Sequence, residues 1–302
     1  MVWFKRISLF LVVNLAMMLT IGLIVSLLGL DRNLYRYGVD YVGLFELCFV
    51  WGMGGAIFSL LISRISAKWM MGVQVIDPNA GGEYGELVRT VHNLARAARL
   101  PAMPEVGVYE SPEVNAFATG PTKSRALVAV STGLLRTMDR DQIEGVLGHE
   151  ITHVANGDMV TLTIIQGVVN AFVLFLSRLA AIAVSNALSN RDDRENSRPN
   201  YFMVSMIDFL FRIVFGIVGA MVVAWFSRWR EFRADAGGAR IAGREKMRSA
   251  LMRLRSYSEA VDQSNPSLAA FKINGGGGGF AALFASHPPL EERIRRLETM
   301  RT

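Results

Sequence analysis

Cysteine is almost missing from this sequence, and histidine is scarce. The single cysteine, Cys48, excludes an internal disulfide and a cysteine-based zinc site, and it fits a reducing compartment. The chain has only 4 histidines, at positions 92, 149, 153 and 287, so few combinations of imidazoles can form a site.

Charged residues are also few: they make up 19% of 302 residues, against 51% that are hydrophobic, and the mean hydropathy is +0.30. This composition is too apolar for an ordinary soluble protein and indicates a membrane protein. The net charge of +6 raises the question of nucleic acid, but the sequence contains no helix-turn-helix, zinc-finger or RNA-binding signature. Cationic flanks of membrane spans explain the charge, and we expect no nucleic-acid partner.

Long apolar runs dominate the sequence, and each is long enough to cross a hydrocarbon core of about 30 Å. They cover residues 7–30, 41–62, 159–184 and 202–226. The first run is too long for a cleavable signal peptide, so we interpret it as an uncleaved signal anchor. The last two runs carry charges, and buried helices of a large soluble domain are the alternative there. We favour spanning helices in a lipid bilayer and predict that Arg178 pairs with Asp208.

The four runs divide the chain into parts with different character. The predicted parts are an N-terminal transmembrane hairpin (1–62), a polar part (63–158), a second transmembrane hairpin (159–226) and a polar C-terminal part (227–302). In the second part, helical periodicity over 83–99 precedes three β-like segments, which predict a small antiparallel sheet. The predicted fold class is therefore α+β, with four transmembrane helices and a mostly helical domain outside the membrane. A glycine run, Gly275–Gly279, is expected to form a mobile loop.

The strongest motif is Gly148-His-Glu-Ile-Thr-His153, on a predicted helix that begins with a capping box. Residues i and i+4 of a helix share one face, so His149 and His153 have the spacing of two ligands of a tetrahedral Zn²⁺. Glu150 then lies beside the metal, where it can take a proton from a water molecule. The alternative is a pair of helix-surface histidines, because the motif also occurs by chance.

Catalytic zinc normally takes three protein ligands and leaves a fourth position open. A metzincin extension is absent, since neither of its further positions is matched after His153. We expect His92 to be structural or exposed. Glu231 is a better candidate for the third ligand than His287. Asp235 lies on the same helix face as Glu231 and can hold a ligating histidine in one tautomer. By spacing alone, Glu231 is equally well a solvated acid among arginines.

The topology favours Glu231. Two runs separate it from the histidine pair, so all three side chains lie on one side of the membrane if both runs span. The positive-inside rule identifies that side as cytoplasmic, because basic residues flank the spans there. These residues are Lys5, Arg6, Arg64, Lys68, Arg136, Arg140, Arg228, Arg230 and Arg233.

As a set, the motifs resemble those of the HtpX family of bacterial heat-shock membrane metalloproteases, relatives of the CAAX prenyl endoprotease. The matching segments are Asn115-Ala-Phe-Ala-Thr-Gly120, the histidine motif extended to Asp158, Glu231-Phe-Arg-Ala-Asp-Ala236, the glycine run and Ser286-His-Pro-Pro289. The resemblance implies a gluzincin-type domain with one Zn²⁺ held by His149, His153 and Glu231, and Glu150 as catalytic base. It also implies a place in the bacterial inner membrane and the clearance of damaged membrane proteins.

The resemblance further suggests His287 as the oxyanion donor, although Ser286–Pro289 can also be simply a helix N-terminal turn. Asn115, Ala116 and Phe117 can form an edge strand that pairs with an extended substrate, or an ordinary strand of the sheet. Expected substrates are membrane proteins and unfolded polypeptides, with self-cleavage on zinc addition. The competing hypotheses are a narrow processing protease and a zinc-stabilised scaffold or stress sensor. The intact Glu150 argues against the scaffold.

Overall fold

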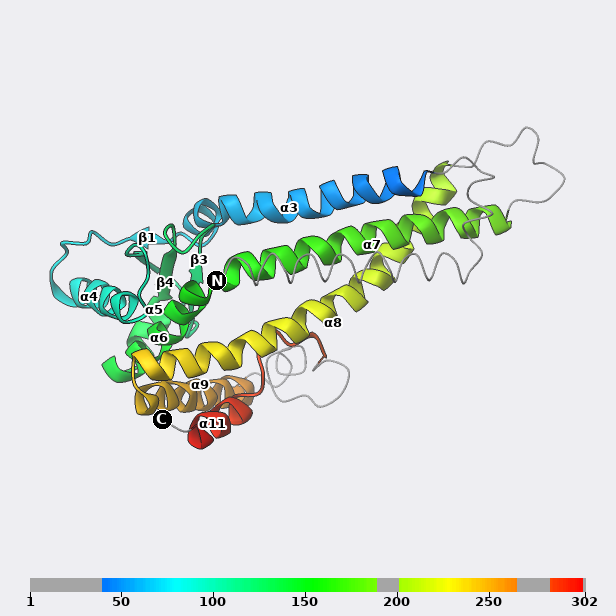
Figure 1. Ribbon diagram of the computed structural model, residues 1–302. Coiled ribbons are helices and arrows are strands. Elements are labelled where there is room, and N and C mark those ends of the chain that lie inside the picture. Colours follow the sequence, from blue (N-terminus) through cyan, green and yellow to red (C-terminus); the bar gives the residue numbers. More distant parts are fainter. Residues whose placement is uncertain (1–39, 189–200, 265–282, 301–302) are drawn as a thin grey trace. The chain divides into compact units, whose positions relative to one another are not determined.

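The computed structural model describes residues 40–188, 201–264 and 283–300 (Figure 1). The predicted first span, residues 189–200 between the last two runs, and the glycine run lie outside the described residues. The chain divides into two compact units. One contains residues up to Phe58 and Thr163–Val223, and the other contains Ser59–Leu162 and Ala224 onward.

Three helices of the described part are long and apolar enough to cross a membrane. They are α3 (Tyr41–Met70), α7 (Asp158–Leu188) and α8 (Tyr201–Ile241). Within the first unit α3 and α7 pack closely: a Cβ at Gly52 would lie 2.4 Å from the backbone nitrogen of Ala171. Gly52 therefore allows close packing of the two helices, as small residues do in membranes.

The predicted pairing of Arg178 with Asp208 is wrong. Asp208 instead accepts from Arg212, one turn further along α8, with 2.7 Å between Oδ2 and Nη2. A partner at i+4 on the same helix needs no match in depth between two helices, so this pair forms locally.

The second unit contains a four-stranded sheet in the order β1-β2-β4-β3. Its strands are β1 (Gln74–Val75), β2 (Glu105–Tyr109), β3 (Ala116–Thr119) and β4 (Leu127–Ser131). The sheet is mixed, because β2 and β4 are parallel whereas the other two pairs are antiparallel. The prediction of an antiparallel sheet is therefore wrong.

The reason is the order of the strands. The chain passes from β2 to the outer position of β3, and a turn at Gly120 (φ 140°) returns it as β4 into the space between them. All five residues of β4 are buried, as expected for a strand that is covered on both faces. A continuous apolar run in the sequence identifies such a strand but does not give the order of the strands in the sheet.

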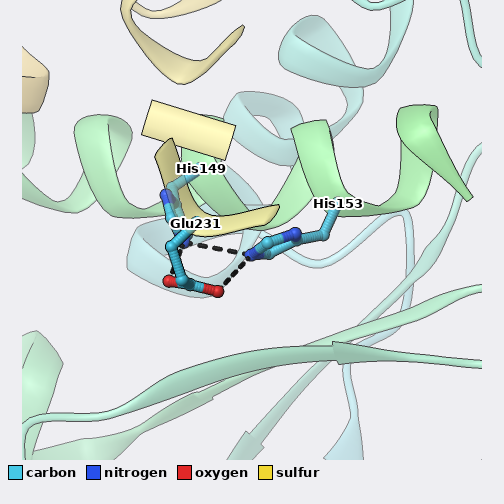
Figure 2. A group of neighbouring side chains, drawn as sticks. All are labelled: His149, His153 and Glu231. Atoms are coloured by element: carbon cyan, nitrogen blue, oxygen red, sulfur yellow. Dashed lines mark hydrogen bonds and ion pairs between the residues drawn. The ribbon is translucent and has the colours of Figure 1, made fainter. Parts of the chain in front are cut away.

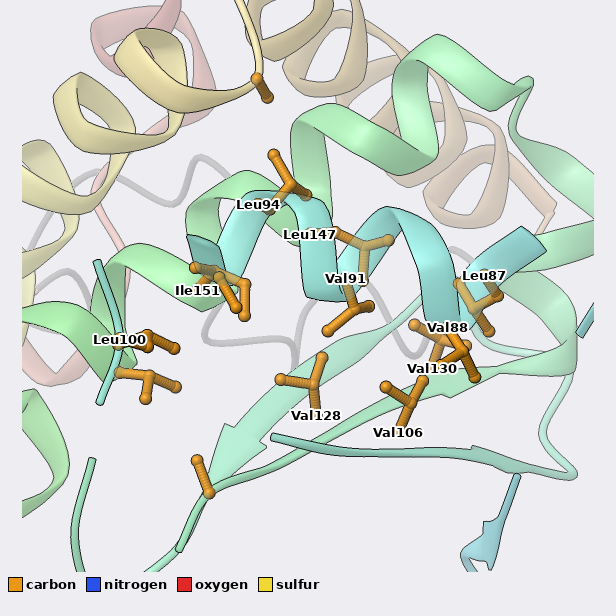
Figure 3. Close-up of a cluster of buried hydrophobic side chains, with 14 of the residues drawn as sticks. Leu87, Val88, Val91, Leu94, Leu100, Val106, Val128, Val130, Leu147 and Ile151 are labelled. Atoms are coloured by element: carbon orange, nitrogen blue, oxygen red, sulfur yellow. The ribbon is translucent and has the colours of Figure 1, made fainter. Parts of the chain in front are cut away.

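Helices complete this unit: α4 (Gly82–Ala97), α5 (Thr132–Thr137), α6 (Arg140–Asn156), α9 (Arg244–Ser264) and α11 (Leu290–Thr299). The predicted stripe of α4 packs Val91 and Leu94 among Val128 of the sheet and Leu147 and Ile151 of α6 (Figure 3). One face of α6 is thus packed in the core, and this packing fixes the position of the helix that carries the histidine motif.

Candidate metal centre

The two motif histidines and Glu231 meet at one point, although α6 and α8 contribute them from distant parts of the sequence (Figure 2). The Nε2 atoms of the two histidines are 3.1 Å apart. The carboxylate oxygens of Glu231 lie 3.3 Å from His149 Nε2 and 3.2 Å from His153 Nε2. Ligand atoms about 2.0–2.1 Å from a tetrahedral zinc are roughly 3.3 Å apart. The three residues therefore fit a single Zn²⁺.

Glycines allow the two helices to come this close. A Cβ at Gly148 would lie 2.8 Å from the Cβ of Ala242, and one at Gly237 would lie 2.2 Å from the side chain of Thr152. Side chains at these positions would push α8 away from α6. The small residues beside each motif thus hold Glu231, which is fully buried, against the histidine pair.

Each histidine is held by a carboxylate on the opposite side of its ring. His149 Nδ1 donates to Asp235 Oδ1 at 2.9 Å, and His153 Nδ1 donates to Asp158 Oδ2 at 2.7 Å. A proton on Nδ1 leaves the lone pair of Nε2 free for a metal. The spacing from Glu231 pointed to Asp235. Asp158 was missed, although Gly157 (φ 69°) ends α6 just before it and so turns it back toward the histidine.

Sequence reasoning also missed Arg293 on α11. Its buried guanidinium donates through Nη2 to Asp235 Oδ1 at 2.6 Å and through Nε to Asp235 Oδ2 at 2.8 Å. Nη1 lies 3.7 Å from Glu231 Oε2. Arg293 therefore fixes Asp235, which in turn orients His149. Helical spacing does indicate the inward position of Arg293, because this residue falls beside Ile294 and Leu297 on the apolar stripe of α11. No local pattern identifies Asp235 as its partner.

The cluster stabilises positive charge. Burial lowers the pKa of His149, but hydrogen bonds to Asp235 and Glu231 outweigh this effect and raise it to about 9. Burial raises the pKa of Glu231, yet contacts with three histidines hold it well below its usual range. Burial also raises the pKa of Asp235, but hydrogen bonds to Arg293 and His149 outweigh this effect and lower the pKa to about 2. Such an environment suits a divalent cation.

A cavity of about 130 Å³ opens beside the cluster. Glu150 and His287 line it together with Asn115 and Ala116. Its other walls are mostly apolar and come from α5, α6 and α9: Leu134, Val146, Met247, Ala250, Leu251 and Leu254. Glu150 thus faces the same space as the proposed ligands without being one of the three clustered groups.

Of the other residues considered in the sequence, His287 lines this cavity, whereas Phe117 and His92 do not. His287 Nδ1 donates to Glu231 Oε2 at 2.8 Å, and its side chain is 52% exposed. Phe117 packs against the ring of Tyr109 and does not line the cavity. His92 lies outside the cluster, with Nε2 3.2 Å from the carbonyl oxygen of Pro104.

The fold and the site define a metalloprotease, because two imidazoles and a carboxylate are a donor set of catalytic zinc. Residues 83–301 match the family model described as peptidase family M48. The chain belongs to this family, and three helices in the described part of the chain are long and apolar enough to cross a membrane.

Relatives that match over nearly the whole length are named as proteases. The chain is 50% identical to a "Protease HtpX homolog" of Methylacidiphilum infernorum, with 98% of each chain covered. It is 48% identical to the "Protease HtpX" of Mannheimia succiniciproducens, over 97% of this chain and 99% of that protein. The crystal structure of S. mikatae Ste24p has a similar fold, with a TM-score of 0.58 at 17% identity. That match covers 95% of this chain and 66% of Ste24p.

Proposed function

We propose that the protein is a zinc-dependent endopeptidase of the bacterial inner membrane that cleaves misfolded or damaged membrane proteins at the cytoplasmic face. The observation that carries this proposal is the buried cluster of His149, His153 and Glu231, with Glu150 in the adjoining cavity. A structural zinc site is normally closed by a fourth protein ligand. The cluster offers three, so a position remains for the reaction.

The residues of the site then take distinct roles. His149 and His153 hold Zn²⁺ through Nε2, and Glu231 holds it through its carboxylate. When bound, the metal lowers the pKa of water to about 7 and polarises the scissile carbonyl. Glu150 accepts a proton from the attacking water and later delivers it to the leaving amine. With a proton on both ring nitrogens, His287 donates through Nδ1 to Glu231 and through Nε2 to the oxygen of the scissile carbonyl.

The strand β3 is placed to bind the substrate backbone. It lies at the edge of the sheet and pairs only with β4 among the described strands. Ser131 N donates to Asn115 O, so by antiparallel alternation Ala116 and Ala118 direct their backbone groups toward the free edge. An extended peptide can form backbone hydrogen bonds with these groups as an added strand. Such pairing recognises the backbone rather than side chains, and it therefore suits broad specificity.

The apolar side of the cavity has room for one substrate side chain, since an apolar cavity of about 150 Å³ can hold benzene. We expect Ala250→Leu to lower kcat/KM about tenfold or more for peptides with leucine or phenylalanine at the cleavage site. Ala250 is fully buried in the wall of the cavity, so the added carbons enter this space. Peptides with alanine at that position provide the internal control. An equal loss for both peptide types would contradict this location of the side-chain pocket.

The four-part organisation and the cytoplasmic active site are tested by the accessibility of introduced cysteines. In a Cys48→Ser background, we expect an impermeant maleimide to label Tyr35→Cys and Glu195→Cys in intact cells. Glu110→Cys should react only after lysis. Four spans place the first two positions outside and the third inside. Labelling of all three positions in intact cells would rule out this topology.

A panel of substrates tests the breadth of cleavage. The purified, zinc-loaded protein is expected to cleave several unrelated denatured proteins as well as its own chain. A narrow processing protease would instead cleave prenylated peptides alone. The zinc-stabilised scaffold predicts cleavage of neither class and a cellular function that survives substitution of Glu150.

A further inference from the structure

The segment Leu283–Pro289, which leads into α11, is held against α8 by Arg228. The guanidinium donates through Nη1 to the carbonyl oxygen of Ala285 at 2.7 Å and to that of Leu283 at 3.2 Å. Arg228 lies three residues before Glu231, so both side chains project from neighbouring positions on one face of α8.

Two further contacts hold the same segment and the helix that follows it. His287 contacts Glu231, as described above, and Arg293 of α11 binds Asp235 through two hydrogen bonds. Arg228, Glu231 and Asp235 are spaced by three and four residues. One face of α8 thus contacts the segment and α11 at successive turns, and His287 lies between the two arginine contacts.

We propose that Arg228 is a positioning residue that holds His287 in the active site. This inference rests on the proposed function, in which His287 contacts the substrate. Because His287 is half-exposed, its own packing fixes it poorly. Without Arg228, the carbonyl groups of Leu283 and Ala285 lose this donor, and the restraint on the N-terminal side of His287 is weakened. Loss of alignment by about 1 Å can cost about 10²-fold in rate.

The residue type fits this role. Both bonds come from Nη1, whose two N–H groups point in fixed directions within the guanidinium plane, so this one nitrogen can donate to both carbonyl groups. A lysine carries the same charge but is a flexible point donor. The alternative is that Arg228 serves only as a cationic flank of a membrane span, in which case lysine replaces it fully.

Arg233 provides a matched control on the same helix. Its guanidinium lies over the ring of Trp229, 4.9 Å from the ring centre. Arg233→Ala removes one positive charge from the same region of α8, as does Arg228→Ala. The structure gives Arg233 no hydrogen bond to the described residues of the 283–289 segment.

The test compares Arg228→Ala, Arg228→Lys, Arg233→Ala, His287→Ala and the double variant Arg228→Ala/His287→Ala in the full-length, zinc-loaded protein. For a fluorogenic peptide, Arg228→Ala should lower kcat by about 10–100-fold with little change in KM. Arg228→Lys should recover part of this loss, and Arg233→Ala should change kcat by less than about 2-fold. In the His287→Ala background, removal of Arg228 should cost no more than about 2-fold, because the two residues act through one contact.

Hydrogen exchange of residues 283–289 provides a second measurement that does not depend on activity. We expect faster exchange in Arg228→Ala than in the wild type and Arg233→Ala. Unchanged exchange, or an equal loss of kcat with and without His287, would overturn the role of Arg228. If the wild type cleaves no peptide at all, the proposed function fails, and the exchange result alone decides whether Arg228 holds the segment.

Discussion

Glu150→Gln is expected to lower kcat for peptide hydrolysis by about 10²–10⁴-fold, the usual contribution of a general acid–base group. Glutamine has the size of glutamate but cannot accept the proton of the attacking water. Glu150 lines the cavity beside His149, yet the ligand cluster does not include it. The zinc content should therefore stay at that of the wild type. Self-cleavage on zinc addition should stop for the same reason.

Metal analysis and peptide hydrolysis on the same detergent-purified sample separate the two effects. Glu144→Gln is the matched control, because Glu144 lies on the same helix and its contact is with Lys246, away from this cavity. Activity that persists in Glu150→Gln would remove Glu150 from the role of base. A loss of zinc in this variant would show instead that Glu150 supports the metal.

Local spacing accounts for the parts of the site that sequence could predict. His149 and His153, and likewise Glu231 and Asp235, are i and i+4 pairs, so helix geometry alone sets each pair on one face. To predict that the two pairs meet, one must also assume that an even number of spans separates them. The structure brings the four side chains together without any use of that premise.

Other parts depend on contacts that no local pattern encodes. Arg293 reaches Asp235 only because α11 packs on α9 through Ile294 and Leu297. Arg295 and Arg296 on the same helix are exposed instead. The order of the strands is another such case, since β4 lies next to β2 in the sheet although β3 comes between them in the sequence. Long-range packing decides both features, whereas helix periodicity decides the positions of the ligands.

Glu231→Gln is expected to weaken zinc binding by more than about 100-fold. Removal of an outer partner of a ligand already costs about 10–100-fold in affinity, and loss of a ligand's charge should cost more. The same substitution should destabilise the metal-free protein by about 3–5 kcal/mol. Glu231 is fully buried and lies against His149, His153, His287 and Arg293, so its neutralisation leaves this cluster of positive and donor groups with one anion fewer. Zinc titration and denaturant unfolding, each with and without chelator, measure the two effects.

Glu245→Gln is the control for this prediction, because Glu245 lies on α9 with a largely exposed side chain and its pairing with Arg248 is long, at 3.9 Å. We expect neither zinc affinity nor stability to change there by a measurable amount. Full zinc occupancy in Glu231→Gln would assign the third ligand to another group, and His287→Ala would then have to lose the metal. A drop in stability without a drop in zinc affinity would reduce Glu231 to a structural anion. The two losses together are expected because the same carboxylate balances charge in the empty site and holds the metal in the loaded one.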